Sequence, residues 1–160
     1  QLQEICRGQV NGLRSFVRSM RPLEPGRAGL VASVMRIVEA FQRDSGILTS
    51  LTIADDVKLE DVEASSATVQ VIREALNNVQ KHSNASQVLI SVGLTNGNVD
   101  FTIRDDGRGF PFSGAFNLDE LETLRMGPAS IKQRVRGLRG DMSIESRPGA
   151  GARLELRIPL

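Results

Sequence analysis

The chain of 160 residues has no tryptophan and no tyrosine, and its six phenylalanines make aromatics only 4% of the sequence. The core must therefore be built from Leu, Val, Ile and Ala, and few rings are left to stack on nucleic-acid bases. An excess of either charge is also lacking, since the formal net charge is +1. We therefore expect no nucleic-acid partner and no attraction to an anionic membrane.

Cysteine and histidine each occur once, as Cys6 and His82. One cysteine forms no internal disulfide and builds no metal cluster, so we expect a reducing compartment, the cytoplasm. No apolar run approaches the roughly 20 residues of a membrane span, and no signal peptide is visible. Because the chain begins without Met, we expect a piece of a longer protein that could be anchored elsewhere.

Helical and extended patterns alternate along a chain whose length fits one domain. Apolar residues at helical spacing predict helices at 3–20, 28–43, 61–82 and 130–138. Runs rich in β-branched residues predict strands at 47–53, 87–94, 98–105, 142–147 and 153–160. Residues 106–127 show no period and are expected to form a long loop. This order predicts an α+β fold, a two-layer α/β sandwich with helices on one face of the sheet, and the first helix is an appendage.

The predicted helix over 61–82 carries a polar column. At about 100° per residue, Glu74, Asn78 and Lys81 fall together on the side opposite the apolar face. One interpretation is a solvated face with a Glu–Lys pair. The other is a site with a base, an oxygen ligand for Mg²⁺ and a cation for phosphate. Spacing alone leaves both open.

The segment "IRDDGRGF" places an acid at the end of a buried strand. By the period of two, Asp105 shares the apolar face of the strand over 98–105, where an unpaired carboxylate is costly. It needs a hydrogen-bond donor, and the exocyclic amine of a purine would serve. Gly107 and Gly109 follow and allow a sharp turn and close approach of a ligand. An ordinary Asp-Gly turn remains the alternative.

Two further glycine motifs are weak by themselves. Gly127 precedes the helix over 130–138, whose N-terminus could attract an anion or be ordinarily capped. Gly149 and Gly151 lie between two predicted strands, where a hairpin explains them equally well.

Together, the four motifs resemble a known family. The helix "REALNNVQKHSNA", then "DDGRGF", a glycine before "SIKQRV", and "PGAGARLELRIPL" resemble the ATP-binding domain of bacterial sensor histidine kinases. This ATPase superfamily also includes DNA gyrase, mismatch-repair and heat-shock chaperone ATPases, and "EALNNVQKH" is similar to the subfamily of nitrate sensors. The resemblance implies a Bergerat-type ATP-binding domain over residues 25–160. Residues 1–24 would be the truncated end of a dimerisation and phosphoacceptor hairpin with its linker.

The resemblance implies roles for the residues of the polar column. Glu74 matches an acid that acts as general base or polarises the acceptor, and Asn78 matches the Mg²⁺ ligand. Lys81 and His82 match positions that face the phosphates. ATP and Mg²⁺ are the implied cofactors.

It also implies roles around the nucleotide. Asp105 matches the residue that hydrogen-bonds the adenine amino group, and Gly107 and Gly109 shape that pocket. A mobile ATP lid would span roughly residues 108–127.

The last two glycine motifs complete the implied nucleotide site. Gly127 begins the second glycine box, and Gly149 and Gly151 match the last one. Two residues depart from the family pattern. Pro128 stands where Leu is usual and would stiffen the lid hinge, and Ala152 replaces a common Thr beside the nucleotide.

The implied function is transfer of the γ-phosphate of ATP to a histidine on the dimerisation domain, for relay to a response regulator. His82 is the only histidine and belongs to the pocket, so the acceptor would lie outside this chain. The full-length protein would be a homodimer, and it could be anchored in a membrane. The alternatives are a non-kinase or chaperone-like ATPase, a serine kinase acting on anti-sigma partners, and a degenerate nucleotide-binding scaffold.

Overall fold

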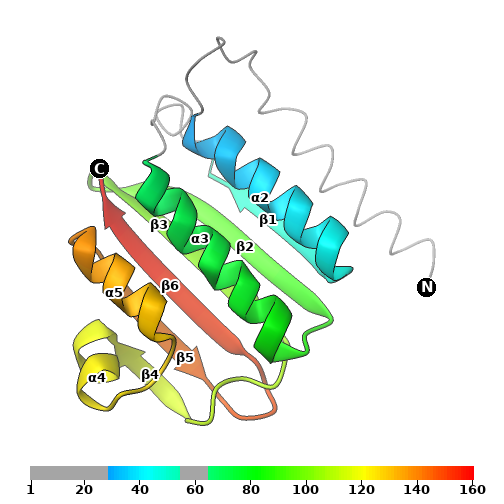
Figure 1. Ribbon diagram of the computed structural model, residues 1–160, viewed down its shortest axis with the longest axis vertical. Helices are drawn as coiled ribbons and strands as arrows, with labels where there is room; N and C mark the ends of the chain where they lie inside the picture. Colours follow the sequence, from blue (N-terminus) through cyan, green and yellow to red (C-terminus); the bar gives the residue numbers. More distant parts are fainter. Residues whose placement is uncertain (1–28, 55–64) are drawn as a thin grey trace.

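One six-stranded sheet organises the computed structural model, which describes residues 29–54 and 65–160 (Figure 1). The strands are β1 Leu48–Ile53, β2 Gln87–Thr95, β3 Asn98–Asp105, β4 Gly114–Asn117, β5 Asp141–Ser146 and β6 Ala152–Pro159. The helices are α2 Leu30–Ser45, α3 Ser66–Asn78, the π-helix η1 Val79–Ser83, α4 Leu118–Thr123 and α5 Ala129–Gly137. The helix expected over 3–20, and with it the segment 1–24, lies outside the described residues.

The sheet is mixed, with strand order β1-β2-β3-β6-β5-β4. Only the pair β1–β2 is parallel, and the other neighbours are antiparallel. Helices α2, α3 and α5 lie side by side across one face (Figure 1). The predicted two-layer α/β sandwich is therefore confirmed. No helix in the described ranges is long and apolar enough to span a membrane.

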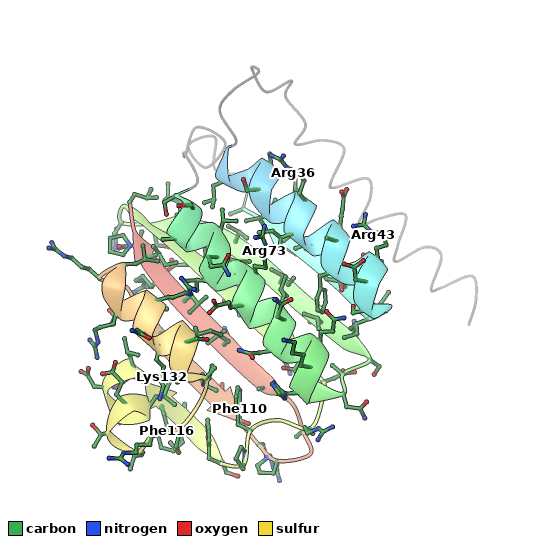
Figure 2. All side chains as sticks on the ribbon, viewed as in Figure 1. Arg36, Arg43, Arg73, Phe110, Phe116 and Lys132 are labelled. Atoms are coloured by element: carbon green, nitrogen blue, oxygen red, sulfur yellow. The ribbon has the colours of Figure 1, made fainter. Side chains whose placement is uncertain are left out.

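The core lies between the helices and the sheet. The apolar positions predicted for α2, from Leu30 to Phe41, are buried, as are Val71, Ile72 and Leu76 of α3. The inward residues of β2 alternate with exposed ones, and those of β3 alternate mainly with half-buried ones. Polar side chains face away from this core, and Figure 2 shows Arg36 and Arg43 on α2 and Arg73 on α3, all exposed. Packing against this core fixes α3 over the middle of the sheet.

Strands β2 and β3 pair antiparallel and form a hairpin. Asn96 and Gly97 both have positive φ, at 51° and 77°. Positive φ at both central residues is the requirement of a type I′ turn, for which Asn-Gly is the preferred pair. The turn fixes the register so that Asp105 pairs with Val88 at the far end of the hairpin.

For the helix expected over 61–82, residues 61–64 lie outside the described residues, and the described part differs from the prediction at its C-terminal end. It begins at Ser66, because the Ser65 side chain caps it by accepting a hydrogen bond from the Thr68 N–H at 3.1 Å. At its C-terminal end the α-helix stops at Asn78 and continues as the π-helix η1. A π-helix closes i→i+5 hydrogen bonds, so the residues after Asn78 are rotated away from their α-helical directions.

The long loop expected over 106–127 is wrong in its second half. Residues 114–117 form β4 at the edge of the sheet and residues 118–123 form α4, with Leu118 and Leu121 fully buried. Asn117 starts α4 with a capping box: its side chain accepts from the Glu120 N–H, and the Glu120 carboxylate accepts from the Asn117 N–H. Such reciprocal bonds stabilise a helix start. Much of the expected mobile lid is therefore a packed part of the fold.

Candidate functional site

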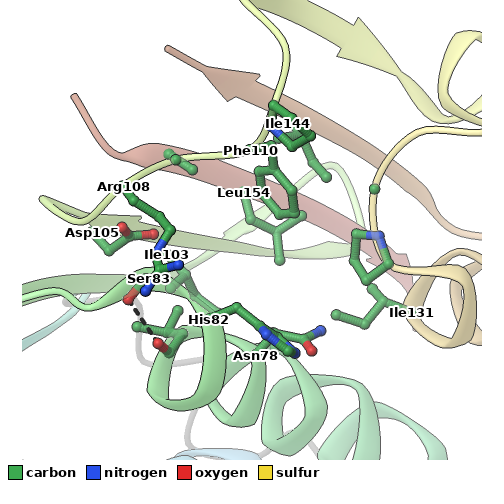
Figure 3. A pocket seen from close by; sticks show the side chains of 17 residues that line it. Asn78, His82, Ser83, Ile103, Asp105, Arg108, Phe110, Ile131, Ile144 and Leu154 are labelled. Carbon is green, nitrogen blue, oxygen red and sulfur yellow. Dashed lines mark hydrogen bonds between the residues drawn. The ribbon is translucent and has the colours of Figure 1, made fainter. Parts of the chain in front are cut away.

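A cavity of about 530 Å³ opens between α3, η1, the segment after β3 and the start of α5 (Figure 3). Its polar lining residues are Asn78, His82, Ser83, Asp105 and Arg108. Its other walls are mainly apolar and include Val79, Ile103, Phe110, Ile131, Ile144 and Leu154. This volume and this mixture of apolar walls with a few polar groups are typical of small-molecule sites.

Asp105 supplies a nearly buried carboxylate to the cavity, with 9% of the residue exposed. Its Oδ1 accepts a hydrogen bond from the Gly107 N–H at 2.9 Å. Within the described part of the chain, Oδ2 receives no hydrogen bond from a side chain. Burial raises the pKa of Asp105 above its usual value, and the bond from Gly107 offsets this in part. The geometry offers one carboxylate oxygen to a donor on a bound ligand.

The turn after Asp105 is clamped from two sides. The Arg108 N–H donates to the Ser83 carbonyl at 2.7 Å, and the Gly149 N–H donates to the Arg108 carbonyl at 2.7 Å. A Cβ on Gly107 would overlap the Ser83 carbonyl, so only glycine allows this close approach to η1. The cavity mouth is therefore held by backbone bonds to both neighbouring elements.

Asp106 plays a different part, which the sequence reasoning missed. Its carboxylate accepts bonds from the Ser86 N–H, the Ser86 hydroxyl and the Gln87 N–H, at 2.8 to 2.9 Å. These bonds, led by that from Gln87, lower the pKa of Asp106 below its usual value. It is exposed and outside the cavity lining. The period of two, which places neighbours on opposite faces, was the available signal.

The polar column on α3 is only partly brought into the cavity. Asn78 and His82 line the cavity (Figure 3). Lys81 is exposed and is not among the lining residues. An α-helix would have kept Lys81 in the column three residues after Asn78. The π-helical turn begins at Val79 and changes these directions, so His82 contributes to the wall instead.

Glu74 also lies outside the cavity lining, and it contacts α5. Its Oε1 accepts a hydrogen bond from Arg134 Nε at 2.8 Å, and Gln70 approaches the same oxygen at 3.4 Å. Burial raises the pKa of Glu74, but hydrogen bonds involving Gln70, Arg134 and Ser130 outweigh it and lower the pKa overall. The Glu74 carboxylate is therefore ionised, and it is hydrogen-bonded to the neighbouring helix α5.

The remaining predicted residues divide into two groups. Gly109, Gly127 and Ala152 line the cavity, whereas Gly149 and Gly151 do not. A Cβ on Gly151 would overlap the Asp105 carbonyl, so this glycine permits close contact between the β5–β6 turn and the end of β3. Gly149 acts on the cavity through its bond to Arg108.

Three phenylalanines that the sequence reasoning did not select form an aromatic cluster, of which one ring reaches the cavity. Phe110 lines the cavity and stacks on Phe112, with ring centroids 5.4 Å apart. Phe112 meets Phe116 of β4 edge-on at the same centroid distance. Figure 2 labels Phe110 and Phe116, which lie on the side of the molecule that carries β4 and α4. Their crowding within residues 110–116 of an aromatic-poor chain was a signal for a local cluster.

A two-layer sandwich with a cavity over one sheet face, closed by glycine turns, defines a small-ligand-binding domain. Residues 63–160 match the family described as histidine kinase-, DNA gyrase B-, and HSP90-like ATPase. This match covers more than half of the sequence, and the chain belongs to this family. The predicted superfamily is thereby confirmed.

Curated relatives are sensor proteins. The sensor histidine kinase LiaS of Bacillus subtilis (strain 168) is 26% identical over 150 residues, which are 94% of this chain and 39% of LiaS. The nitrate/nitrite sensor protein NarX of Escherichia coli (strain K12) is 27% identical over 139 residues, which are 87% of this chain and 22% of NarX. The chain thus spans well under half of these relatives, and a nitrate sensor is among the proteins to which it is similar.

A solved structure supports the fold. The ATP binding domain of PrrB from Mycobacterium tuberculosis gives a TM-score of 0.58 at 24% identity, covering 82% of this chain and 94% of that domain. At this identity the likeness concerns the arrangement of helices and strands, which confirms the α+β architecture derived above.

Proposed function

We propose that the chain binds Mg-ATP in this cavity and donates the γ-phosphate to a histidine on the dimerisation domain of a two-component sensor kinase. A response regulator would then receive the phosphoryl group. The observation that carries the proposal is Asp105, a nearly buried carboxylate with one oxygen available in a mainly apolar cavity. Family membership supplies the nucleotide class.

The base end of the nucleotide would lie at Asp105. The Oδ1 atom is already bonded to Gly107, which leaves Oδ2 to accept from the adenine amino group. Ile103, Ile144 and Leu154 provide apolar surface for the flat ring. Burial makes such a bond to a carboxylate stronger than it would be in water.

The phosphate end would lie toward Asn78. Within residues 29–54 and 65–160, no three His, Cys, Asp or Glu side chains gather into a metal site. Asn78 fits as a single amide ligand for Mg²⁺, because this ion usually takes few protein ligands and keeps phosphate oxygens and water around it. When bound, Mg²⁺ would neutralise charge on the phosphates.

The remaining residues would support the phosphates from around the cavity. His82 lines the wall beside Asn78, and the exposed Lys81 side chain is long enough to approach the phosphates from the solvent side. Gly127 and Ala152 line the walls and let the nucleotide approach the backbone.

The acceptor would come from another domain, because His82 is the only histidine of the sequence and forms part of the cavity wall. We expect a full-length homodimer, with this domain in the cytoplasm. Phosphoryl transfer needs positioning and charge neutralisation more than covalent participation by the protein, and the cavity provides the first.

Calorimetric titration with ATP, with and without Mg²⁺, tests the proposal. We expect saturable binding that Mg²⁺ strengthens, and Asn78→Ala should remove the effect of Mg²⁺ while ATP alone still binds. Asn77→Ala is the matched control, because Asn77 is exposed and outside the cavity lining. Absence of ATP binding at millimolar concentration would refute the proposed function, and equal Mg²⁺ dependence in wild type and Asn78→Ala would refute the role of Asn78.

A further inference from the structure

The ion pair between Glu74 and Arg134 joins two helices through residues that are 60 positions apart in the sequence. Arg134 Nε lies 2.8 Å from Glu74 Oε1, and the two side chains are 46% and 19% exposed. Glu74 belongs to α3, in the centre of the helical layer, and Arg134 belongs to α5 at its side (Figure 1). The pair is therefore a direct polar link between these helices.

The surroundings of Glu74 do not suit a proton acceptor. Its Oε1 is bonded to Arg134, and its Oε2 is buried without a hydrogen-bond partner among the described residues. A general base needs a path to the proton and a pKa near the operating pH. One oxygen is thus bonded to Arg134 and the other is buried, and the hydrogen bonds lower the pKa of Glu74.

Helix α5 forms one side of the cavity. Pro128 and Ile131, at its start, line the cavity, and Ile131 lies three residues before Arg134. Residues at this spacing are neighbours on a helix, so the position of Arg134 and the position of Ile131 are coupled. Another polar contact of this turn, from Lys132 Nζ to the Leu121 carbonyl at the longer distance of 3.4 Å, leads to α4 instead.

We propose that Glu74 and Arg134 are positioning residues, whose pair holds the start of α5 against α3 and so sets the width of the nucleotide cavity. The role rests on the proposed function, since it concerns the same cavity, but it reassigns Glu74. The carboxylate acts on ATP through Arg134 and α5, and it accepts no proton from the acceptor histidine.

Exchange of the two charges provides the sharpest test. Glu74→Arg and Arg134→Glu, made singly, should each weaken Mg-ATP binding about tenfold, because like charges then face each other across the two helices. The double variant restores opposite charges and should recover most of the affinity. Titrations are made well below each variant's unfolding midpoint, so that loss of folded protein does not imitate loss of affinity.

Two milder variants keep the test decisive if a reversed charge prevents folding. Glu74→Gln should weaken binding severalfold, whereas Arg134→Lys should lie close to wild type because it keeps the charge. Arg136→Gln is the matched control on the same helix. Arg136 pairs with Asp119 and Glu122 of α4, so its loss removes ion pairs but leaves the α3–α5 link intact.

The outcomes separate the inference from the proposed function. Wild type that binds no ATP would refute the proposed function and with it this inference. Wild type that binds ATP, with Glu74→Gln and both single charge reversals binding equally well, would refute the inference alone. So would a folded double variant that recovers none of the lost affinity.

Discussion

Asp105 and Asp106 are neighbours in the chain with opposite surroundings. Strand alternation turns Asp105 into the cavity and Asp106 toward the start of β2, where three donors meet it. Burial raises the pKa of the first, and hydrogen bonds lower the pKa of the second. At neutral pH the charge on Asp105 therefore opposes folding, while the charge on Asp106 supports it.

Asparagine at each position should separate the two effects. Asp105→Asn should weaken ATP binding about 100-fold, because its NH₂ group would face the adenine amine, donor against donor. It should leave the thermal midpoint unchanged or higher. Asp106→Asn should bind ATP like wild type but melt at a lower temperature. Calorimetry measures the ATP affinity of the two variants, and thermal unfolding at neutral pH measures their melting temperatures. Loss of ATP binding in Asp106→Asn but not in Asp105→Asn would contradict the role given to Asp105.

At the scale of elements, β4 and α4 show what sequence periodicity can and cannot predict. The periods of α2, β2 and β3 extend over several turns or pairs, and their predictions are confirmed. Helix α4 has six residues, fewer than two turns, so its buried Leu118 and Leu121 show no recognisable period. Sequence periodicity did not predict the π-helical turn for another reason: the prediction assumed the same rotation per residue along the whole helix.

The buried face of α4 predicts that this element is part of the folding unit. Leu121→Ala should lower the free energy of unfolding by about 2–5 kcal/mol, since Leu121 is fully buried. Leu124→Ala is the control: Leu124 is 56% exposed and should change stability by less than about 0.5 kcal/mol. Denaturant titration of both variants measures the difference. Equal effects would mean that α4 does not belong to the core.

At the scale of the whole molecule, the cavity is assembled from distant parts of the chain. Asn78 comes from α3, Asp105 from β3, Ile131 from α5 and Leu154 from β6. The sequence motifs predicted Asn78 and Asp105 from the segments in which these residues lie. The pair of Glu74 and Arg134 is separated by 60 residues, and no sequence spacing predicts it. Only the packing of both helices on one sheet brings that pair together.

A ligand that bridges these parts should stabilise all of them together. ATP at about 100 times its dissociation constant should add about 2.7 kcal/mol to the free energy of unfolding, because only the folded chain forms the cavity. Thermal unfolding with Mg²⁺ and increasing ATP measures the rise. Asp105→Asn should show almost no rise at the same ATP concentration, and an equal rise would place the nucleotide elsewhere.

The π-helical turn at Val79–Ser83 makes the molecule sensitive to chain length at one point. Because its bonds run i→i+5, the turn holds one residue more than an α-helical turn would. A single deletion there would give a more regular helix, yet it would withdraw the Ser83 carbonyl from the Arg108 N–H. Substitutions in this turn change only side chains, whereas a deletion changes which backbone groups reach the cavity mouth. Related sequences that keep this mouth should therefore tolerate changes of residue type in the turn more readily than changes in its length.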